Sequence, residues 1–328
     1  MNLIGLRHHR LPTALFVLAL LFSSSTTAAQ PFPSQPLRIL VGGPAGSVDD
    51  THARKIGDKL AVALGQPVVI DNRAGATGAI AADAVARAKP DGHTLFFGNT
   101  SSVAINPAIF SKLTYDQRSF APVSGLARAT PLLLVHPQLP VRTVAELIAY
   151  AKTRPGKLSY GSAGVGSIQH LTMEQFERMH GLYLVHIPYK GASDALNDLM
   201  GGRTEVQVNF STIAQPHVQS GRLRALAVVG GNKRKAWLPD VPTAEELGMP
   251  AFDGTAWNGF VVPAGTPADV IARLNREIVA AAHAKDYADW LTQLGGEVIA
   301  GSPDEFGRLI DADAERWAVV VRVAKVRE

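Results

Sequence analysis

Four short segments combine glycine, serine and other small residues in a way that suits the binding of a small anion. Each follows an expected strand and precedes an expected helix, and they cover residues 44–50 (PAGSVDD), 72–78 (NRAGATG), 161–167 (GSAGVGS) and 189–193 (YKGAS). The first turn of a helix presents unpaired backbone N–H groups and the positive end of the helix dipole, which attract anions. One such segment alone is more simply a tight turn with a helix cap. Two from each half of the chain favour an anion site.

Familiar enzyme motifs are incomplete in these segments. Residues 161–167 space their glycines like a phosphate-binding P-loop, but no lysine precedes Ser167. Tyr160 takes the place of the first glycine of a G-x-S-x-G nucleophile elbow. A dinucleotide-binding G-x-G-x-x-G that begins at Gly164 has Gln169 where its third glycine belongs. The motifs therefore predict a binding protein and no enzyme.

A serine hydrolase remains the alternative. Ser167 and His170 lie three residues apart on one expected helix, and Ser162 lies shortly before them. A catalytic pair of Ser162 or Ser167 with His170 would also need an orienting acid and an oxyanion hole. The sequence has no cysteine, which excludes disulfides, thiolate metal sites and a lipoprotein anchor. Its histidines show no H-E-x-x-H spacing, and we expect no metal and no cofactor.

Two charged residues in the four segments have an ordinary explanation and a functional one. Lys190 offers an ammonium group to a carboxylate, or is a solvated lysine of a turn. Asp50 lies in the first turn of a helix, where an acid stabilises the helix dipole. Because an acid there would repel an anionic ligand, we expect Asp50 to order the loop or bind water in preference to contacting the ligand directly.

Alternating strands and helices position these segments, which predicts α/β lobes with mostly parallel sheets flanked by helices. The expected strands are residues 37–41, 67–70, 94–98, 158–161, 184–187, 205–209, 223–229 and 259–263. The expected helices lie around residues 53–64, 78–88, 167–180, 193–200 and 215, with one after the Thr143/Glu146 cap and two more after Thr266-Pro267 and Ser302-Pro303.

The pattern restarts after the segment 135–140 (VHPQLP), which we interpret as a hinge. We expect a second hinge crossing near Trp257. Lobe 1 would comprise residues 30–136 and 257–328, and lobe 2 residues 137–256, with a cleft between them.

The N-terminus is typical of a secretory signal peptide, which would cover residues 1–29. Arg7 to Arg10 give a positive start, residues 14–22 (ALFVLALLF) a short apolar core, and residues 27–29 (TAA) a cleavage site near Ala29. The whole chain has 328 residues, 46% of them hydrophobic, and a net charge of +4, which excludes a disordered chain. Residues 1–29 contribute two arginines and no acid, so the remainder carries 30 basic and 28 acidic residues. A net charge of +2 argues against a nucleic-acid partner.

The sequence resembles the Bug-type solute-binding proteins of tripartite tricarboxylate transporters from about Pro36 to Lys325. The matching stretches are residues 44–46, Asp50 with 53–54, 65–69, 72–73 with Gly75 and Gly78, 90–92 with 94–95, 120–123, 155–158, 160–164, 188–191, 221–227, 238–243 and 263–267. The resemblance implies a two-lobed periplasmic-binding-protein-like fold of type II. It also implies a periplasmic receptor that closes on a small carboxylate and delivers it to membrane permease subunits. A sensor kinase is an alternative partner, and we expect a monomer.

In this family, backbone amides and waters of a first-lobe loop hold one carboxylate, and second-lobe loops complete the cage. Transferred to matching positions, the ligand-binding residues are Pro44, Ala45, Gly46, Ser47, Asp50, Ser162, Ala163, Gly164 and Ser167, with Lys190, Gly191 and Ala192 as weaker candidates. This chain departs from the family at Gly42-Gly43 (usually Pro-Phe), Ser47 (glycine), His93 (an aromatic residue) and Ser211 (often an acid). Because Gly42, Gly43 and Ser47 lie at the expected anion loop, the ligand's size and affinity would depend on them. Which carboxylate is bound does not follow from the side chains.

Overall fold

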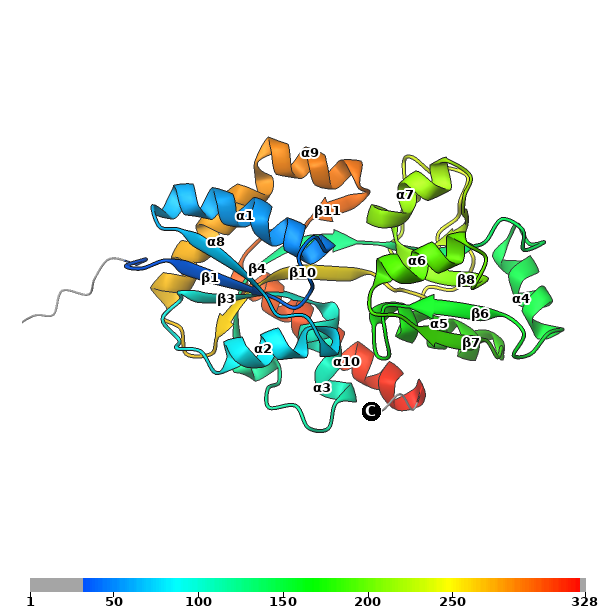
Figure 1. Cartoon of the computed structure of the whole chain (residues 1–328), viewed down its shortest axis with the longest axis horizontal. Helices are drawn as coiled ribbons and strands as arrows, with labels where there is room; N and C mark the ends of the chain where they lie inside the picture. Colours follow the sequence, from blue (N-terminus) through cyan, green and yellow to red (C-terminus); the bar gives the residue numbers. More distant parts are fainter. Residues whose placement is uncertain (1–31, 325–328) are drawn as a thin grey trace, which may run out of the picture.

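The computed structural model describes residues 32–324, and the expected signal peptide lies outside them. Two β-sheets, each flanked by helices, lie side by side along the long axis of the molecule (Figure 1). The first sheet has six strands in the order β11-β4-β10-β3-β1-β2, and the second has five in the order β7-β6-β8-β5-β9. This is the two-lobed α/β architecture predicted from the sequence.

The first sheet contains β1 (Leu37–Val41), β2 (Val68–Asn72), β3 (Thr94–Asn99), β4 (Phe120–Ala129), β10 (Ala256–Pro263) and β11 (Gly296–Val298). Strand β1 pairs in parallel with β2 and β3, whereas β10 runs antiparallel between β3 and β4. The run 37–41 (LRILV) is nearly continuous in apolar residues because β1 lies inside the sheet. The carboxyl ends of β1, β2 and β3 therefore lie at one edge.

The second sheet contains β5 (Pro131–Val135), β6 (Ser159–Ser162), β7 (Val185–Pro188), β8 (Val206–Phe210) and β9 (Arg224–Val228). Strands β6, β7 and β8 are parallel, and β5 runs antiparallel to β8 and β9. Each sheet thus has one central strand of opposite direction, β10 or β5, and each of these two strands adjoins a crossing between the lobes.

The chain crosses first at Thr130, between β4 of the first sheet and β5 of the second. The boundary expected after residue 136 left β5 in lobe 1, whereas its ladders with β8 and β9 place it in the second sheet. That boundary was too late because the turn at residues 136–140 follows the crossing strand. The return crossing leads into β10, which begins at Ala256.

Helices cover both sheets. Those of the first lobe are α1 (Val48–Leu64), α2 (Ala79–Ala86), α3 (Asn106–Ile109), α8 (Ala268–His283), α9 (Lys285–Gln293) and α10 (Pro303–Ala324), with short helices η1 (Ala76–Gly78), η2 (Thr100–Ile105) and η3 (Gln117–Ser119). Those of the second are α4 (Val144–Lys152), α5 (Ile168–His180), α6 (Ala192–Met200) and α7 (Ser211–Gln219). Among residues 32–324, no helix is long and apolar enough to cross a membrane.

Local signals explain several helix ends. Helix α1 begins after Ser47, whose side chain accepts from the N–H of Asp50, and it ends at Gly65 with a φ of 67°. Ser302 and Glu305 form a reciprocal capping box at α10. At α8, Pro267 is the N-cap residue, one position before the first-turn place expected for it.

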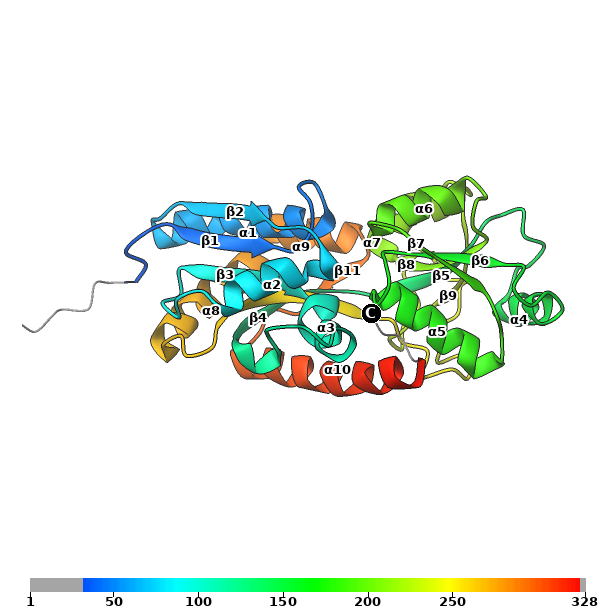
Figure 2. The same ribbon diagram turned by 60° about the horizontal axis from the view of Figure 1, so that its bottom comes forward.

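Each lobe has its own apolar core, and a smaller cluster joins the two. That cluster combines Ile105 and Ile109 of the first lobe with Ile168 and Leu171 of α5, and Trp317 and Val321 of α10 complete it. Figure 2 shows α10 running beneath the first lobe as far as α5. The lobes are therefore packed together along one side, next to the N-terminus of α5.

Candidate functional site

The four segments singled out in the sequence follow the carboxyl ends of β1, β2, β6 and β7. These strand ends face each other across the space between the lobes (Figure 1). Loop 161–167 reaches the first lobe: a Cβ placed on Gly166 would lie 2.5 Å from Cδ1 of Ile109 in α3. In open α/β sheets, ligands bind beyond the carboxyl ends of the strands. The segments thus occupy the position that a ligand site between two lobes requires.

Asp50 orders loop 44–50. Its Oδ2 atom accepts the N–H of Gly46 at 2.8 Å and the Nε–H of Arg54 at 3.0 Å, and the residue is buried. Burial by itself would raise the pKa of Asp50, but the hydrogen bonds from Arg54 and Gly46 outweigh it and lower the pKa. Asp50 therefore stays ionised and is directed into its own loop, as its sequence position predicts.

This arrangement decides which amides of the loop can meet a ligand. The N–H of Gly46 is bound to Asp50, and the N–H of Ser47 donates to the carbonyl of Pro44 at 3.1 Å. Val48 and Asp49 are the first helical residues of α1, so their N–H groups have no carbonyl one turn earlier. The N–H groups of Val48 and Asp49 thus have no acceptor within their own helix, whereas the N–H of Gly46 is already engaged by Asp50.

Asp49 has a role that its position in the sequence does not indicate. Its Oδ2 atom accepts Nδ2–H of Asn99 at 2.8 Å, and Asn99 pairs with Asn258 across β3 and β10. Burial raises the pKa of Asp49, while the side chains of Asn99 and Asn258 lower it in part. A carboxyl group thus lies at the edge of the first sheet beside the return crossing.

Loop 72–78 supports loop 44–50 through a close backbone contact. A Cβ on Gly42 would lie 2.6 Å from Cα of Gly78, so no side chain fits there without moving the backbone. Nδ2–H of Asn72 donates to the carbonyl of Gly43 at 3.1 Å. Nε–H of Arg73 donates to Asp71 at 3.0 Å, so this cation is engaged within its own lobe. The glycine at position 42 is therefore a packing requirement between two loops.

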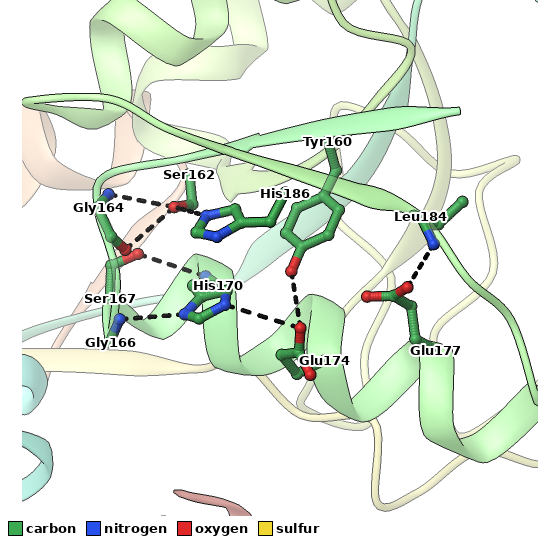
Figure 3. A network of polar contacts seen from close by, with 10 residues as sticks. All are labelled: Tyr160, Ser162, Gly164, Gly166, Ser167, His170, Glu174, Glu177, Leu184 and His186. Atoms are coloured by element: carbon green, nitrogen blue, oxygen red, sulfur yellow. Dashed lines mark hydrogen bonds and ion pairs between the residues drawn. The ribbon is translucent and has the colours of Figure 1, made fainter. Parts of the chain in front are cut away.

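Loop 161–167 is held by side chains that lie behind it (Figure 3). Ser162 Oγ accepts the N–H of Gly164 at 3.1 Å and lies 2.7 Å from Nε2 of His186. The N–H of Gly166 donates to Nδ1 of His170 at 3.0 Å. Ser167 caps α5, because its Oγ accepts the N–H of His170 at 3.3 Å. Ser162 and Ser167 thus shape the loop.

The same geometry bears on the hydrolase alternative. Ser162 pairs with His186 and not with His170, and its side chain is fully buried, with 0% exposure. Ser167 is also buried, and its hydroxyl serves as a helix cap. A nucleophile must reach its substrate, so neither serine forms the accessible Ser–His pair that hydrolysis requires.

Two histidine rings stack behind the loop. The ring centroids of His170 and His186 are 3.9 Å apart with an interplanar angle of 9°, and Tyr160 stacks on His186 at 4.9 Å. The parallel pairing of Tyr160 with His186 in β6 and β7 brings these rings together. Burial, helped by the charge of His186, lowers the pKa of His170 to about 3, and burial lowers that of His186 to about 4. Both rings are neutral at neutral pH.

Loop 189–193 adjoins this group. The N–H of Tyr189 donates to the carbonyl of Ser162 at 3.0 Å, and Nδ2–H of Asn209 donates to the carbonyl of Ala192 at 3.1 Å. Gly191 is the N-cap of α6, so the N–H groups of the first residues of that helix have no carbonyl acceptor within the helix. Lys190 is exposed. The structure brings all four predicted segments to the space between the lobes.

A further contact joins the lobes on the side opposite the apolar cluster. Ser211 Oγ–H and Lys235 Nζ–H of the second lobe both donate to the carbonyl of Gly295, each at 3.3 Å. Gly295 follows α9 in the first lobe, and Figure 1 shows α7 facing β11 there. The small hydroxyl at position 211 thus serves an interlobe hydrogen bond.

Known proteins share this sequence and this fold. The family described as tripartite tricarboxylate transporter family receptor matches residues 52–325. BugT of Bordetella pertussis is 34% identical over 301 residues, which is 91% of this chain and 92% of BugT. A Rhodopseudomonas palustris protein solved with adipate has a TM-score of 0.83 and 34% identity, covering 90% of this chain and all of that one (100%). MatC from Rhodopseudomonas palustris with bound malate has a TM-score of 0.81 and 33% identity, covering 88% of this chain and 100% of MatC.

Proposed function

Because the chain belongs to the tripartite tricarboxylate transporter receptor family, we propose that it binds a small carboxylate between its lobes and delivers it to a permease of that transporter type. The relatives are solute receptors and not enzymes, and two of similar structure carry adipate and malate. The family implies a periplasmic location. We further propose that residues 1–29 are a signal peptide, cleaved near Ala29, and that the receptor acts as a monomer.

The observation that carries this proposal is the placement of free helix N-termini on both sides of one space. In the first lobe the donors are the N–H groups of Val48 and Asp49, with Ala45 beside them. The shape of this loop is set by the hydrogen bonds of Asp50 with Gly46 and Ser47. Pro44 shapes the loop too, and it has no N–H to offer a ligand. Charge-assisted hydrogen bonds from such amides suit a carboxylate.

The second lobe supplies the opposing donors in this proposal. Ala163 follows β6, and Gly191 and Ala192 lie at the start of α6. Ser162, Gly164 and Ser167 hold the loop in place, and Lys190 adds a positive charge at the rim. A carboxylate that contacts both lobes stabilises the closed form by the difference in its affinity for the closed and open forms. The permease would then recognise the closed receptor.

Isothermal titration calorimetry and thermal-shift measurements on residues 30–328 test the proposal. The probes are malate, adipate, other di- and tricarboxylates, and the amides of the same acids as neutral controls. We expect at least one carboxylate to raise the melting temperature and its amide to have no effect. A folded protein that responds to none of the carboxylates would refute the proposal.

A further inference from the structure

One of the two stacked histidines, His170, is buried and bonds directly to the backbone of loop 161–167. His170 is 5% exposed, and its Nδ1 atom accepts the N–H of Gly166 at 3.0 Å. An imidazole nitrogen can accept only when it carries no proton. The contact therefore requires the neutral ring with its proton on Nε2. A protonated ring would turn an N–H toward the N–H of Gly166.

Ser162 connects the second ring to the same loop. Its hydroxyl oxygen accepts the N–H of Gly164, lies 3.0 Å from the carbonyl of Gly164 and lies 2.7 Å from His186. Gly164 has a φ of 117°, a conformation that side chains rarely adopt, so the loop depends on these bonds for its shape. His170 thus holds the N–H of Gly166. Ser162, which contacts His186, holds the N–H of Gly164 in the same loop.

The charged and titratable groups around the two stacked rings cannot stabilise a positive charge on both His170 and His186. Nε2 of His170 lies 3.7 Å from Glu174 on the same helix, and Glu174 also accepts the O–H of Tyr160 from β6 at 3.1 Å. Glu177 is directed to the N–H of Leu184, and burial raises its pKa to about 7. Glu174 is one counter-charge for two rings that are 3.9 Å apart. One like charge beside another in a buried position is strongly unfavourable.

We propose that His170 is a positioning residue for loop 161–167, and that the loop keeps its carboxylate-binding shape only while this ring is uncharged. The proposal rests on the proposed function for the role of the loop in binding, but the shape of the loop can be measured without a ligand. The receptor would then release its carboxylate as its surroundings become acidic.

The direction of this effect follows from proton linkage. The pKa of His170 is about 3 in the ordered loop, against 6.5 for a free histidine, so the displaced loop binds the proton more tightly. Acid therefore favours the displaced loop, and the effect grows as the pH falls from 6.5 toward the pKa of the ordered state. Titration of this one ring can shift the equilibrium by at most about tenfold per pH unit.

Two substitutions separate the acceptor from the titration. Asn in H170N places a carbonyl oxygen close to the position of Nδ1, so it can accept from Gly166 at every pH. Leu in H170L has a similar size and no acceptor, and leaves the N–H of Gly166 without a partner. H283N is the matched control, because His283 lies at the end of α8 in the first lobe and is exposed.

The first readout is the pair of glycine amide resonances of Gly164 and Gly166 in the ligand-free protein, followed by NMR from pH 7.5 to 4. We expect both to move or broaden with the titration of His170 in wild type and in H283N. In H170N they should stay in place, and in H170L they should be displaced at every pH. Resonances that stay fixed in wild type, or that move equally in H170N, would overturn the proposal.

The second readout is the dissociation constant for malate and adipate over the same pH range. Ligand ionisation affects all variants equally, so the comparison is between variants. We expect wild type to weaken more than H170N below pH 6.5, and H170L to bind about tenfold more weakly at pH 7.5 because a buried donor loses its acceptor. Equal pH profiles for wild type and H170N would refute the proposal. If no variant binds either acid, the proposed function fails with these probes while the glycine resonances still decide the role of the stack.

Discussion

Replacing Gly46 with valine tests directly whether loop 44–50 binds the ligand. A Cβ at this position meets no atom within 4 Å, so the new side chain would project into the space in front of the loop. The φ of Gly46 is 80°, and a non-glycine residue there costs about 1–2 kcal/mol of folding stability. Gly65 offers a matched control, since it has a φ of 67° and an equally open surrounding at the far end of α1.

The two variants should destabilise the fold alike and differ in binding. A stability loss of 1–2 kcal/mol lowers the melting temperature of a chain this long by a few degrees. In G46V the ligand also loses close approach to the amides at the start of α1, and one charge-assisted hydrogen bond is worth about 1.5–3 kcal/mol, or roughly 10- to 150-fold in affinity. G65V should bind like wild type. Calorimetry with the carboxylate found in the screen measures this, and equal affinities of G46V and G65V would remove loop 44–50 from the site.

Three further changes have effects that the structure defines. D50N should weaken binding about tenfold and also lower the melting temperature, because loop 44–50 loses a charged acceptor for two donors; calorimetry showing unchanged affinity would contradict this. E177Q should stabilise the protein by about 1–3 kcal/mol above pH 7, since burial raises the pKa of Glu177 to about 7 and its ionisation then opposes folding, and urea unfolding at pH 8 and pH 5 should show a gain only at the higher pH. G42A should lower the melting temperature more than G46V, because its Cβ would lie 2.6 Å from backbone of the neighbouring loop, and a smaller loss would show that the two loops can separate cheaply.

The parts of the fold that follow from local patterns were predictable from the sequence. The run 37–41 is apolar throughout apart from Arg38, as a buried parallel strand requires, and Ser302 with Glu305 marks the start of α10. Strand β4 was missed because residues 120–129 (FAPVSGLARA) show no alternation. Its small residues allow close contacts instead: a Cβ on Gly259 of β10 would lie 2.5 Å from the carbonyl oxygen of Ser124.

The position of the four glycine- and serine-rich loops between the lobes was predictable from the sequence, but the hydrogen bonds of their amides were not. Which N–H groups remain available depends on side chains that return to the backbone, as Asp50 does to Gly46 and His170 to Gly166. His186 lies 24 residues after Ser162 in the sequence, and only the register of β6 and β7 brings the two together. Glycine and serine content therefore predicts a candidate anion loop, whereas tertiary packing decides which of its N–H groups stay free of protein acceptors.

The two sides of the molecule resist separation of the lobes very unequally. Parting α5 from α10 would expose isoleucine, leucine and tryptophan side chains, each of which contributes about 1.5–3 kcal/mol when buried. On the opposite side, the carbonyl of Gly295 accepts only two hydrogen bonds, and water can replace both. We therefore expect the lobes to open by a tilt about the contact between α5 and α10. If the proposed function holds, we expect the carboxylate to enter and leave at the α7 rim, and a permease that holds this rim apart to empty the receptor without unfolding any of it.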